Sequence, residues 1–279
     1  MIEIFNDNWE KLCSSYELDL IKTFECGQCF RWNADNCGVY SGVVRGHFAK
    51  IKNENCDVLI KSSNNDIEFW KNYFDLNSDY ELAHNQMRKE EYLKKSVEFG
   101  RGIRILKQEA WETLCSFIVS QCNNIPRIKK IIRSLCELFG EKKQFEEDFY
   151  YTFPSAGSVF KLNSDELGRI KAGYRAAYIM SAAEAVSSGN INLDYLKILN
   201  YNDAQKKLMD INGVGEKVAN CVLLFGLNKT EAFPEDVWIK KALKEKLSPD
   251  FDPKSLGEYA GLAQQYIFYT IREENRIKS

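Results

Sequence analysis

The chain has 279 residues, with 38 lysines and arginines, 40 aspartates and glutamates, and a formal net charge of -2. This length allows one large domain or two smaller ones with substantial cores, and the near-neutral charge does not by itself indicate a nucleic-acid binder. The sequence has no apolar run of about 20 residues, so we expect no membrane-spanning helix and no membrane partner. Its first residues lack a basic-then-apolar export signal. We therefore expect an intracellular protein, in the cytoplasm or nucleoid if the source is prokaryotic.

The cysteine content indicates reduced thiols rather than a disulfide framework. The nine cysteines form an odd set, and no export signal accompanies them. Cys26 and Cys29 have the spacing of a zinc or redox pair, but His47 and His84 are the only histidines and no second paired motif follows. We therefore expect no bound metal.

The first part of the chain alternates in hydrophobicity, and the rest follows a helical period. Short strand candidates are divided by Asn, Asp and Gly, and they cover residues 29–32, 39–44, 47–51 and 57–60. Residues 67–74 become helical, and helices follow one another from Glu81 onward. The pattern predicts an α+β protein with an N-terminal antiparallel β domain over residues 1–78 and a larger all-helical domain over residues 79–279.

One string near the N-terminus combines a glycine turn with aromatic and basic residues. It runs from Phe24 to Trp32 and contains Gly27 at its centre. By residue chemistry alone it is a glycine turn that enters a strand.

Two later stretches place basic residues beside a turn. After the predicted helix 110–120, Asn124 can cap a second helix whose exposed face carries Arg127, Lys129, Lys130 and Arg133. Residues 167–178 form another basic turn broken by glycines, with Tyr174 and Arg175 after Gly173. Such faces are often simply solvated, so these patterns alone leave open whether they contact DNA.

A helix, a tight hairpin and a second helix are predicted over residues 204–226. Apolar residues keep helical spacing on both sides of the turn Gly213-Val214-Gly215. Two glycines within three residues expose backbone N–H groups, and the N-terminus of the second helix points at the same place, so the turn can bind a phosphate without reading sequence. The alternative is an ordinary corner between two helices.

Two ionisable residues flank this hairpin. Lys217 lies in the first turn of the second helix, where the helix dipole disfavours a cation by up to about 1 kcal/mol. That field and partial burial favour the neutral amine, the form that attacks carbon and makes a Schiff base. Asp236 precedes the amphipathic run 237–247, so its carboxylate is placed to cap that helix and to face Lys217. The alternatives are a solvated lysine and a plain helix cap.

Together, the strings from Gly213 to Lys217 and from Pro234 to Val237 closely resemble the signature of the helix-hairpin-helix, Gly/Pro...Asp superfamily of base-excision DNA glycosylases. The string from Gly27 to Trp32 resembles the 8-oxoguanine DNA glycosylases of eukaryotic type within that superfamily. The resemblance runs from about Tyr16 to Phe268.

This resemblance implies a bifunctional DNA glycosylase and lyase. Lys217 would break the N-glycosidic bond of an extruded 8-oxoguanine and nick the strand by β-elimination, while Asp236 stabilises positive charge on the sugar. Duplex DNA containing 8-oxoguanine would be the partner, and we expect a monomer. The chain lacks the four-cysteine cluster of endonuclease III-type relatives, so we expect no iron–sulfur cluster and no required cofactor. Relatives hold a monovalent cation by hairpin carbonyls, and the sequence allows one here.

The resemblance also implies a base pocket. In the family a glycine carbonyl accepts N7–H of the oxidised base, which normal guanine lacks, and a glutamine meets the Watson–Crick edge. These roles fall on Gly27 and Gln264. Cys221 and Phe268 fall at the positions that sandwich the ring. On the residues alone, Phe268 would be a core residue and Gln264 a surface one.

Contacts with the DNA outside the pocket are implied for three turns. The hairpin would hold phosphate, a tyrosine would wedge into the base stack, and arginines would contact the base opposite the lesion. The residues concerned are Asn123, Arg127, Tyr174, Arg175, Gly213, Val214 and Gly215.

Two positions depart from the family pattern. Cys122 stands where an asparagine reads the opposite cytosine, and Trp238 stands where a histidine often meets the DNA backbone. Two rival functions remain open. One is a glycosylase of the same fold for another lesion, such as an alkylated base, and the other is a DNA-binding hairpin protein without catalysis.

Overall fold

The computed structural model describes residues 9–276 and begins with a twisted antiparallel sheet. Its strand order is β1-β5-β4-β3-β2, and each neighbouring pair is antiparallel. The strands are β1 (Glu10–Ser14), β2 (Asn33–Ala34), β3 (Tyr40–Val44), β4 (His47–Glu54) and β5 (Asp57–Ser62). The predicted N-terminal antiparallel sheet is therefore confirmed.

Helices make up most of the rest of the described chain. The first helices along the chain are α1 (Leu20–Glu25), α2 (Ile67–Tyr73), α3 (Glu81–Met87) and α4 (Glu91–Gly100). The middle helices are α5 (Ala110–Ser120), α6 (Ile125–Phe139), α7 (Ala156–Phe160), α8 (Ser164–Gly168) and α9 (Arg175–Ser187). The last are α10 (Leu193–Ile198), α11 (Tyr201–Met209), α12 (Glu216–Phe225), α13 (Val237–Glu245), the 3₁₀ helix η1 (Pro253–Tyr259) and α14 (Ala260–Arg276). None of the helices within residues 9–276 has the length and apolar character needed to span a membrane.

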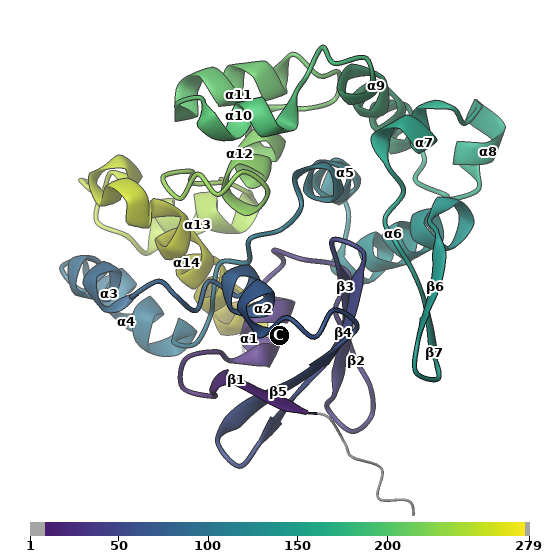
Figure 1. Ribbon diagram of the computed structural model, residues 1–279. Helices are drawn as coiled ribbons and strands as arrows, with labels where there is room; N and C mark the ends of the chain where they lie inside the picture. Colours follow the sequence, from purple (N-terminus) through teal and green to yellow (C-terminus); the bar gives the residue numbers. More distant parts are fainter. Residues whose placement is uncertain (1–8, 277–279) are drawn as a thin grey trace, which may run out of the picture.

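The sheet lies at one end of the molecule with α1 and α2 beside it, and α14 packs against α4 and α13 (Figure 1). The sheet buries one face because its side chains alternate, so that Ile51 on β4 is buried opposite Ile60 on β5 and Tyr40 on β3. Trp32 packs in the same core against Gly42, where any added Cβ would collide with the indole.

The helical core extends into the N-terminal part of the chain. Cys26 and Phe30 pack with the helices, whereas Leu106 packs with the sheet. A short hairpin of β6 (Lys142–Phe145) and β7 (Asp148–Tyr151) also interrupts the helices, and the sequence patterns did not indicate it. The two predicted domains are therefore packed together by residues exchanged between their cores.

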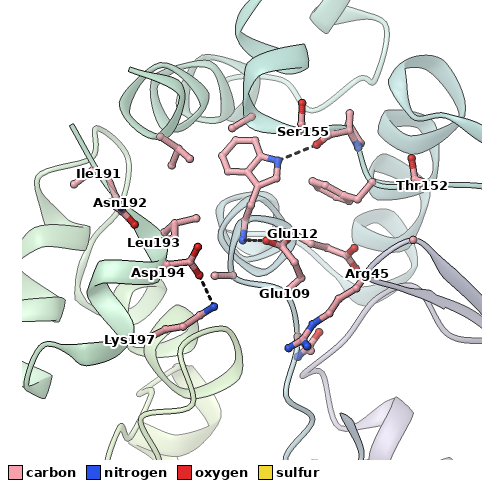
Figure 2. A pocket seen from close by; sticks show the side chains of 18 of the residues that line it. Arg45, Glu109, Glu112, Thr152, Ser155, Ile191, Asn192, Leu193, Asp194 and Lys197 are labelled. Atoms are coloured by element: carbon pink, nitrogen blue, oxygen red, sulfur yellow. Dashed lines mark hydrogen bonds and ion pairs between the residues drawn. The ribbon is translucent and has the colours of Figure 1, made fainter. Parts of the chain in front are cut away.

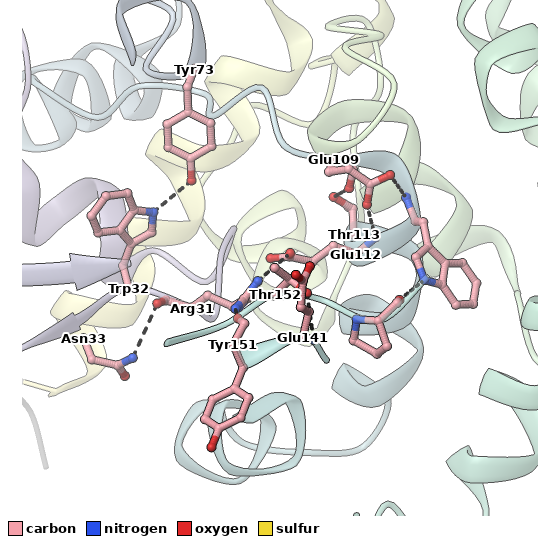
Figure 3. A network of polar contacts seen from close by, with 12 residues as sticks. Arg31, Trp32, Asn33, Tyr73, Glu109, Glu112, Thr113, Glu141, Tyr151 and Thr152 are labelled. Carbon is pink, nitrogen blue, oxygen red and sulfur yellow. Dashed lines mark hydrogen bonds and ion pairs between the residues drawn. The ribbon is translucent and has the colours of Figure 1, made fainter. Parts of the chain in front are cut away.

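A buried ion pair joins the sheet, α5 and β7 (Figure 3). An Arg31 guanidinium nitrogen lies 3.1 Å from a Glu112 carboxylate oxygen, and another donates to the Tyr151 carbonyl. Burial raises the pKa of the Glu112 carboxyl above its ordinary value, and the Arg31 charge opposes that rise. Only 11% of the Arg31 side chain and 16% of the Glu112 side chain are exposed, so water is a poor substitute partner for either charge.

Removing one member of this pair should destabilise the fold more than replacing both. We expect Arg31→Met to lower the free energy of unfolding by about 3 to 5 kcal/mol at pH 7, because it leaves Glu112 buried and unpaired. The loss should shrink as the pH falls, since a buried carboxyl with a raised pKa binds a proton in the folded state. Arg31→Met combined with Glu112→Gln should recover part of the loss in urea unfolding.

A matched control is the more exposed pair of Lys50 and Asp148, whose charged atoms are 2.6 Å apart. Lys50→Met should cost no more than about 1 kcal/mol. Equal losses for Lys50→Met and Arg31→Met would contradict the importance given to the buried pair.

Candidate active site

Residues from five separate segments line a small cavity of about 50 Å³. The turn after α1, helix α5, helix α12, the segment before α13 and helix α14 meet there. The cavity gathers all the residues that the sequence analysis assigned to catalysis and to the base pocket, namely Lys217, Asp236, Gly27, Cys221, Gln264 and Phe268. The structure thus brings them to one place.

The hairpin between α11 and α12 has the predicted form. Gly213 adopts φ of +86°, and an added Cβ would collide with the ring of Tyr178, so only glycine fits. Val214 is buried beneath the turn, whereas Gly215 is exposed at the N-cap of α12. The Gln121 side chain donates a 3.0 Å hydrogen bond to the Gly213 carbonyl and ties the turn to α5.

Lys217 reaches from the first turn of α12 toward α5 and is half-buried. Its Nζ donates to the Ser120 hydroxyl at 3.2 Å and lies 5.3 Å from the centre of the Phe117 ring. The Ser120 hydroxyl in turn donates to the Phe117 carbonyl at 2.8 Å. Among residues 9–276, no carboxylate comes within ion-pair distance of Lys217, so the amine is held by uncharged groups.

Cys221 lies one helical turn after Lys217 and is buried. Burial raises the pKa of its thiol to about 11, although Lys217 nearby opposes that rise. The thiol is therefore neutral near pH 7 and offers an apolar, polarisable surface to the cavity.

Asp236 caps α13, as predicted. Its Oδ1 accepts the backbone N–H groups of Trp238 and Ile239, each at 2.9 Å. Its Oδ2 has no hydrogen bond within the described part of the chain. The cap therefore fixes the side chain and leaves one carboxylate oxygen for chemistry in the cavity.

Gly27 and Phe268 form the opposite wall. Gly27 adopts φ of +79°, and a Cβ on it would lie 3.3 Å from the Phe268 ring. The Arg272 guanidinium lies 5.2 Å from the centre of the same ring and donates to the Glu25 carbonyl at 3.2 Å. Gln264, expected on the surface from the bare pattern, is instead buried on α14 with only 4% of its area exposed.

The turn at the end of α5 is held by Arg175. This arginine is buried, and its guanidinium donates to the carbonyls of Gln121 and Cys122. Cys122 is exposed with φ of +47°, a left-handed conformation that asparagine adopts more readily. Tyr174 stands exposed above, with the Arg175 guanidinium 4.4 Å from its ring centre. Contact between Arg175 and a DNA base stays a prediction, since it requires leaving these carbonyls.

The α6 side of this turn is partly as expected. Asn124 caps α6 by accepting the Arg127 N–H at 3.0 Å, and the Arg127 side chain is exposed. The Asn123 amide donates to the Val119 carbonyl at 3.0 Å. The expectation that Lys129 belongs to an exposed basic face is wrong, because its ammonium donates to the Trp32 carbonyl at 2.9 Å and pairs with Glu25.

Two of the larger cavities on the described structure are lined mostly by other residues. One of about 670 Å³ lies at the N-terminal end of α5, where Arg45, Glu109, Asp194 and Lys197 line it (Figure 2). The Asp194 and Lys197 side chains pair with each other at 2.7 Å. The other, of about 570 Å³, opens beside Lys217 between α11 and η1. Neither contains the other residues of the candidate active site.

Sequence reasoning missed several residues at this site. Ser120, Gln121, Phe117 and Gln265 all touch Lys217, the hairpin or the cavity lining. Ser120 is the last residue of the apolar helix α5 and Gln121 is its C-cap. Polar residues at the end of an apolar helix were only a weak indication of a functional role. The Cys26 and Cys29 thiols are buried and separate, and no cluster of three metal-ligating side chains occurs among residues 9–276.

Comparisons with known proteins find DNA glycosylases, and the relatives named for 8-oxoguanine or as N-glycosylase/DNA lyases match at higher identity than the 3-methyladenine glycosylases. A model of the 8-oxoguanine DNA glycosylase N-terminal domain matches residues 11–114. The N-glycosylase/DNA lyase of Arabidopsis thaliana is 31% identical over an alignment of 287 positions. The alignment covers 90% of this chain and 77% of the relative. The 8-oxoguanine glycosylase/lyase of Clostridium acetobutylicum, solved with double-stranded DNA containing cytosine opposite 8-oxoguanine, is 37% identical with a TM-score of 0.85. That match covers 94% of this chain and 93% of the other.

The left-handed conformation of Cys122 predicts a gain in stability on substitution. Cys122→Asn should raise the free energy of unfolding by about 0.5 kcal/mol, because asparagine tolerates this backbone conformation better. Cys37→Asn is the matched control, since Cys37 is also exposed but lies outside the left-handed positions. Urea unfolding of both variants tests this, and equal changes would show that the backbone is not the cause.

Proposed function

Because the chain belongs to the 8-oxoguanine DNA glycosylase family, we propose that the cavity holding Lys217 and Asp236 is its active site. The protein is a bifunctional DNA glycosylase and lyase that acts in base-excision repair. One observation supports the assignment most strongly: the six residues given catalytic or base-pocket roles come from four segments and line the same cavity.

The first chemical step is displacement of the damaged base. The lone pair of neutral Lys217 Nζ forms a bond to C1′ of the sugar, while the bond between C1′ and N9 breaks and its electron pair leaves with the base. The leaving base takes up a proton. The free Oδ2 of Asp236 faces the developing positive charge on the sugar and helps to move protons. Ser120 and Phe117 hold the amine in position from α5.

The second step cuts the strand. Opening of the sugar ring gives a Schiff base between Lys217 Nζ and C1′. The imine acidifies the hydrogen at C2′, so a base can remove that proton while the bond from C3′ to the 3′ phosphate oxygen breaks. Water then releases the lysine from the product.

The base pocket selects the lesion. The Gly27 carbonyl accepts N7–H of 8-oxoguanine, Gln264 meets the Watson–Crick edge, and Cys221 and Phe268 cover the two ring faces. The cavity has a volume of only about 50 Å³, which is too small for a purine base, and the Phe268 ring packs close to Gly27. The phenyl ring must therefore move when a base enters. An 8-oxoguanine preference over alkylated bases rests on these contacts.

Duplex DNA is held outside the pocket. The Gly213-Val214-Gly215 turn binds phosphate, Tyr174 fills the stack, and Arg127 and Asn123 approach the opposite strand. Trp238 has one indole N–H to offer the backbone there. We infer a monomer that works inside the cell, where its DNA substrate is found.

No cofactor is required by this mechanism, because Lys217 supplies the nucleophile. A monovalent cation at the hairpin remains part of the proposal. The Gly213 carbonyl accepts Gln121 and the Ile211 carbonyl accepts the Val214 N–H, but each carbonyl oxygen keeps a second lone pair. EDTA should leave both activities intact.

The decisive test is borohydride trapping on a duplex with 8-oxoguanine opposite cytosine. The native chain should give a covalent protein–DNA band, because borohydride reduces the Schiff base. Lys217→Gln should lose the band and slow base release by at least about 1,000-fold while keeping duplex binding. Ser120→Ala is the matched variant, and it should keep the band at a reduced rate. Binding without any band from the native chain would exclude the lysine mechanism on this lesion and favour a glycosylase for another lesion or a non-enzymatic hairpin protein.

The opposite base gives a separate test of Cys122. Cytosine recognition should be weaker than with asparagine at this position, since a thiol is a poor hydrogen-bond partner for a base. Cys122→Asn should therefore raise the ratio of base-release rates with cytosine and adenine opposite the lesion by about 5- to 20-fold. Single-turnover rates on the two duplexes measure that ratio, and Cys37→Asn should leave it unchanged. No change with Cys122→Asn would remove Cys122 from opposite-base recognition.

A further inference from the structure

A second glutamine in the base cavity has no assigned role. Gln264 and Gln265 are consecutive on α14, and only 4% and 3% of their areas are exposed. Both line the cavity that contains Lys217. Consecutive helical residues normally point in different directions, so two buried amides at one cavity need an explanation.

The two side chains are hydrogen-bonded to each other. Gln265 Nε2 donates to Gln264 Oε1 at 2.8 Å. The Gln265 Oε1 is fully buried, and it has no hydrogen-bond partner among the described residues. The Gln264 amide nitrogen likewise has none there. A buried acceptor without a partner is unfavourable, and a ligand that supplies the donor removes that cost.

The bond between the amides determines what this carboxamide pair can offer. The hydrogen bond between them uses the Gln265 Nε2 donor and the Gln264 Oε1 acceptor. In this arrangement the free acceptor is Gln265 Oε1 and the free donor is the Gln264 amide nitrogen, and both remain for a ligand. The pair is therefore complementary to an edge that presents an acceptor next to a donor.

We propose that Gln265 is a specificity-determining residue which, together with Gln264, recognises the O6 acceptor and N1–H donor of an extruded 6-oxopurine. The inference rests on the proposed function of the cavity. An 8-oxoguanine edge satisfies both members of the pair. An 8-oxoadenine edge presents a donor at position 6 and an acceptor at N1, so it reverses both requirements and leaves buried groups unpaired.

The test compares base release with strand cleavage at an abasic site. Gln265→Met keeps the approximate volume but removes both hydrogen-bonding groups. It should lower the single-turnover rate of 8-oxoguanine release by about 10- to 100-fold. It should also lower the rate ratio between 8-oxoguanine and 8-oxoadenine by at least about tenfold. Cleavage of a duplex with a preformed abasic site should stay within about twofold of the native rate, because no base is recognised there.

Two further variants keep the result interpretable. Gln265→Asn retains an amide that is one methylene shorter, so it should fold and give a smaller loss of the same rate ratio. Thr270→Val is the matched control, because Thr270 is another buried residue of α14 whose hydroxyl has no partner, but it does not line the cavity. It should leave both activities unchanged.

Each outcome decides a different question. An unchanged rate ratio in Gln265→Met and Gln265→Asn, or an equal fall in base release and abasic cleavage, would overturn the role of Gln265. Failure of the native chain to cleave either duplex would instead overturn the proposed function. Loss of base release and of the rate ratio, with abasic cleavage preserved, would support the inference.

Discussion

The Gln28 side chain fixes the geometry on which the base pocket depends. Its amide nitrogen donates to the carbonyls of Thr23 and Arg104, at 3.0 and 2.8 Å, and its oxygen accepts the Leu106 N–H at 2.9 Å. Gln108 closes the arrangement by donating to the Gln28 carbonyl at 2.7 Å. These bonds join the turn containing Gly27 to the segment that leads into α5. The carbonyl assigned to lesion recognition therefore belongs to a buried, fully bonded frame.

The same frame explains why the string from Gly27 to Trp32 resembles a family motif as a whole. Arg31 pairs with Glu112, and Trp32 donates to the Tyr73 hydroxyl at 2.9 Å within the sheet core. These residues position α5 relative to the sheet, and α5 then carries Ser120 to Lys217. Only Gly27 in this string lines the cavity. Most residues of this string therefore hold the fold together rather than line the cavity.

The sequence allowed the local features to be predicted and left the distant contacts open. The hairpin and the Asp236 cap follow from glycine spacing, helical periodicity and capping preference, which act over a few residues. The contact of Ser120 with Lys217 joins residues 97 apart and depends on how α5 crosses α12. The burial of Arg175 and Gln264 is likewise a tertiary result, because a polar side chain in a helix is exposed by default. The family resemblance predicted a pocket position for Gln264, whereas periodicity predicted an exposed one, and the side chain is buried and lines the cavity.

The DNA-facing turns are mechanically linked through Gln121. Its carbonyl accepts the Arg175 guanidinium, and its side chain donates to the Gly213 carbonyl in the hairpin. Any contact that draws Arg175 toward DNA releases the Gln121 and Cys122 carbonyls, and so loosens the segment that supports both the hairpin and Ser120. Tyr174 stands directly beside that arginine. Under the proposed function, insertion of Tyr174 into the DNA stack would therefore act on the same short turn that supports the hairpin and Ser120.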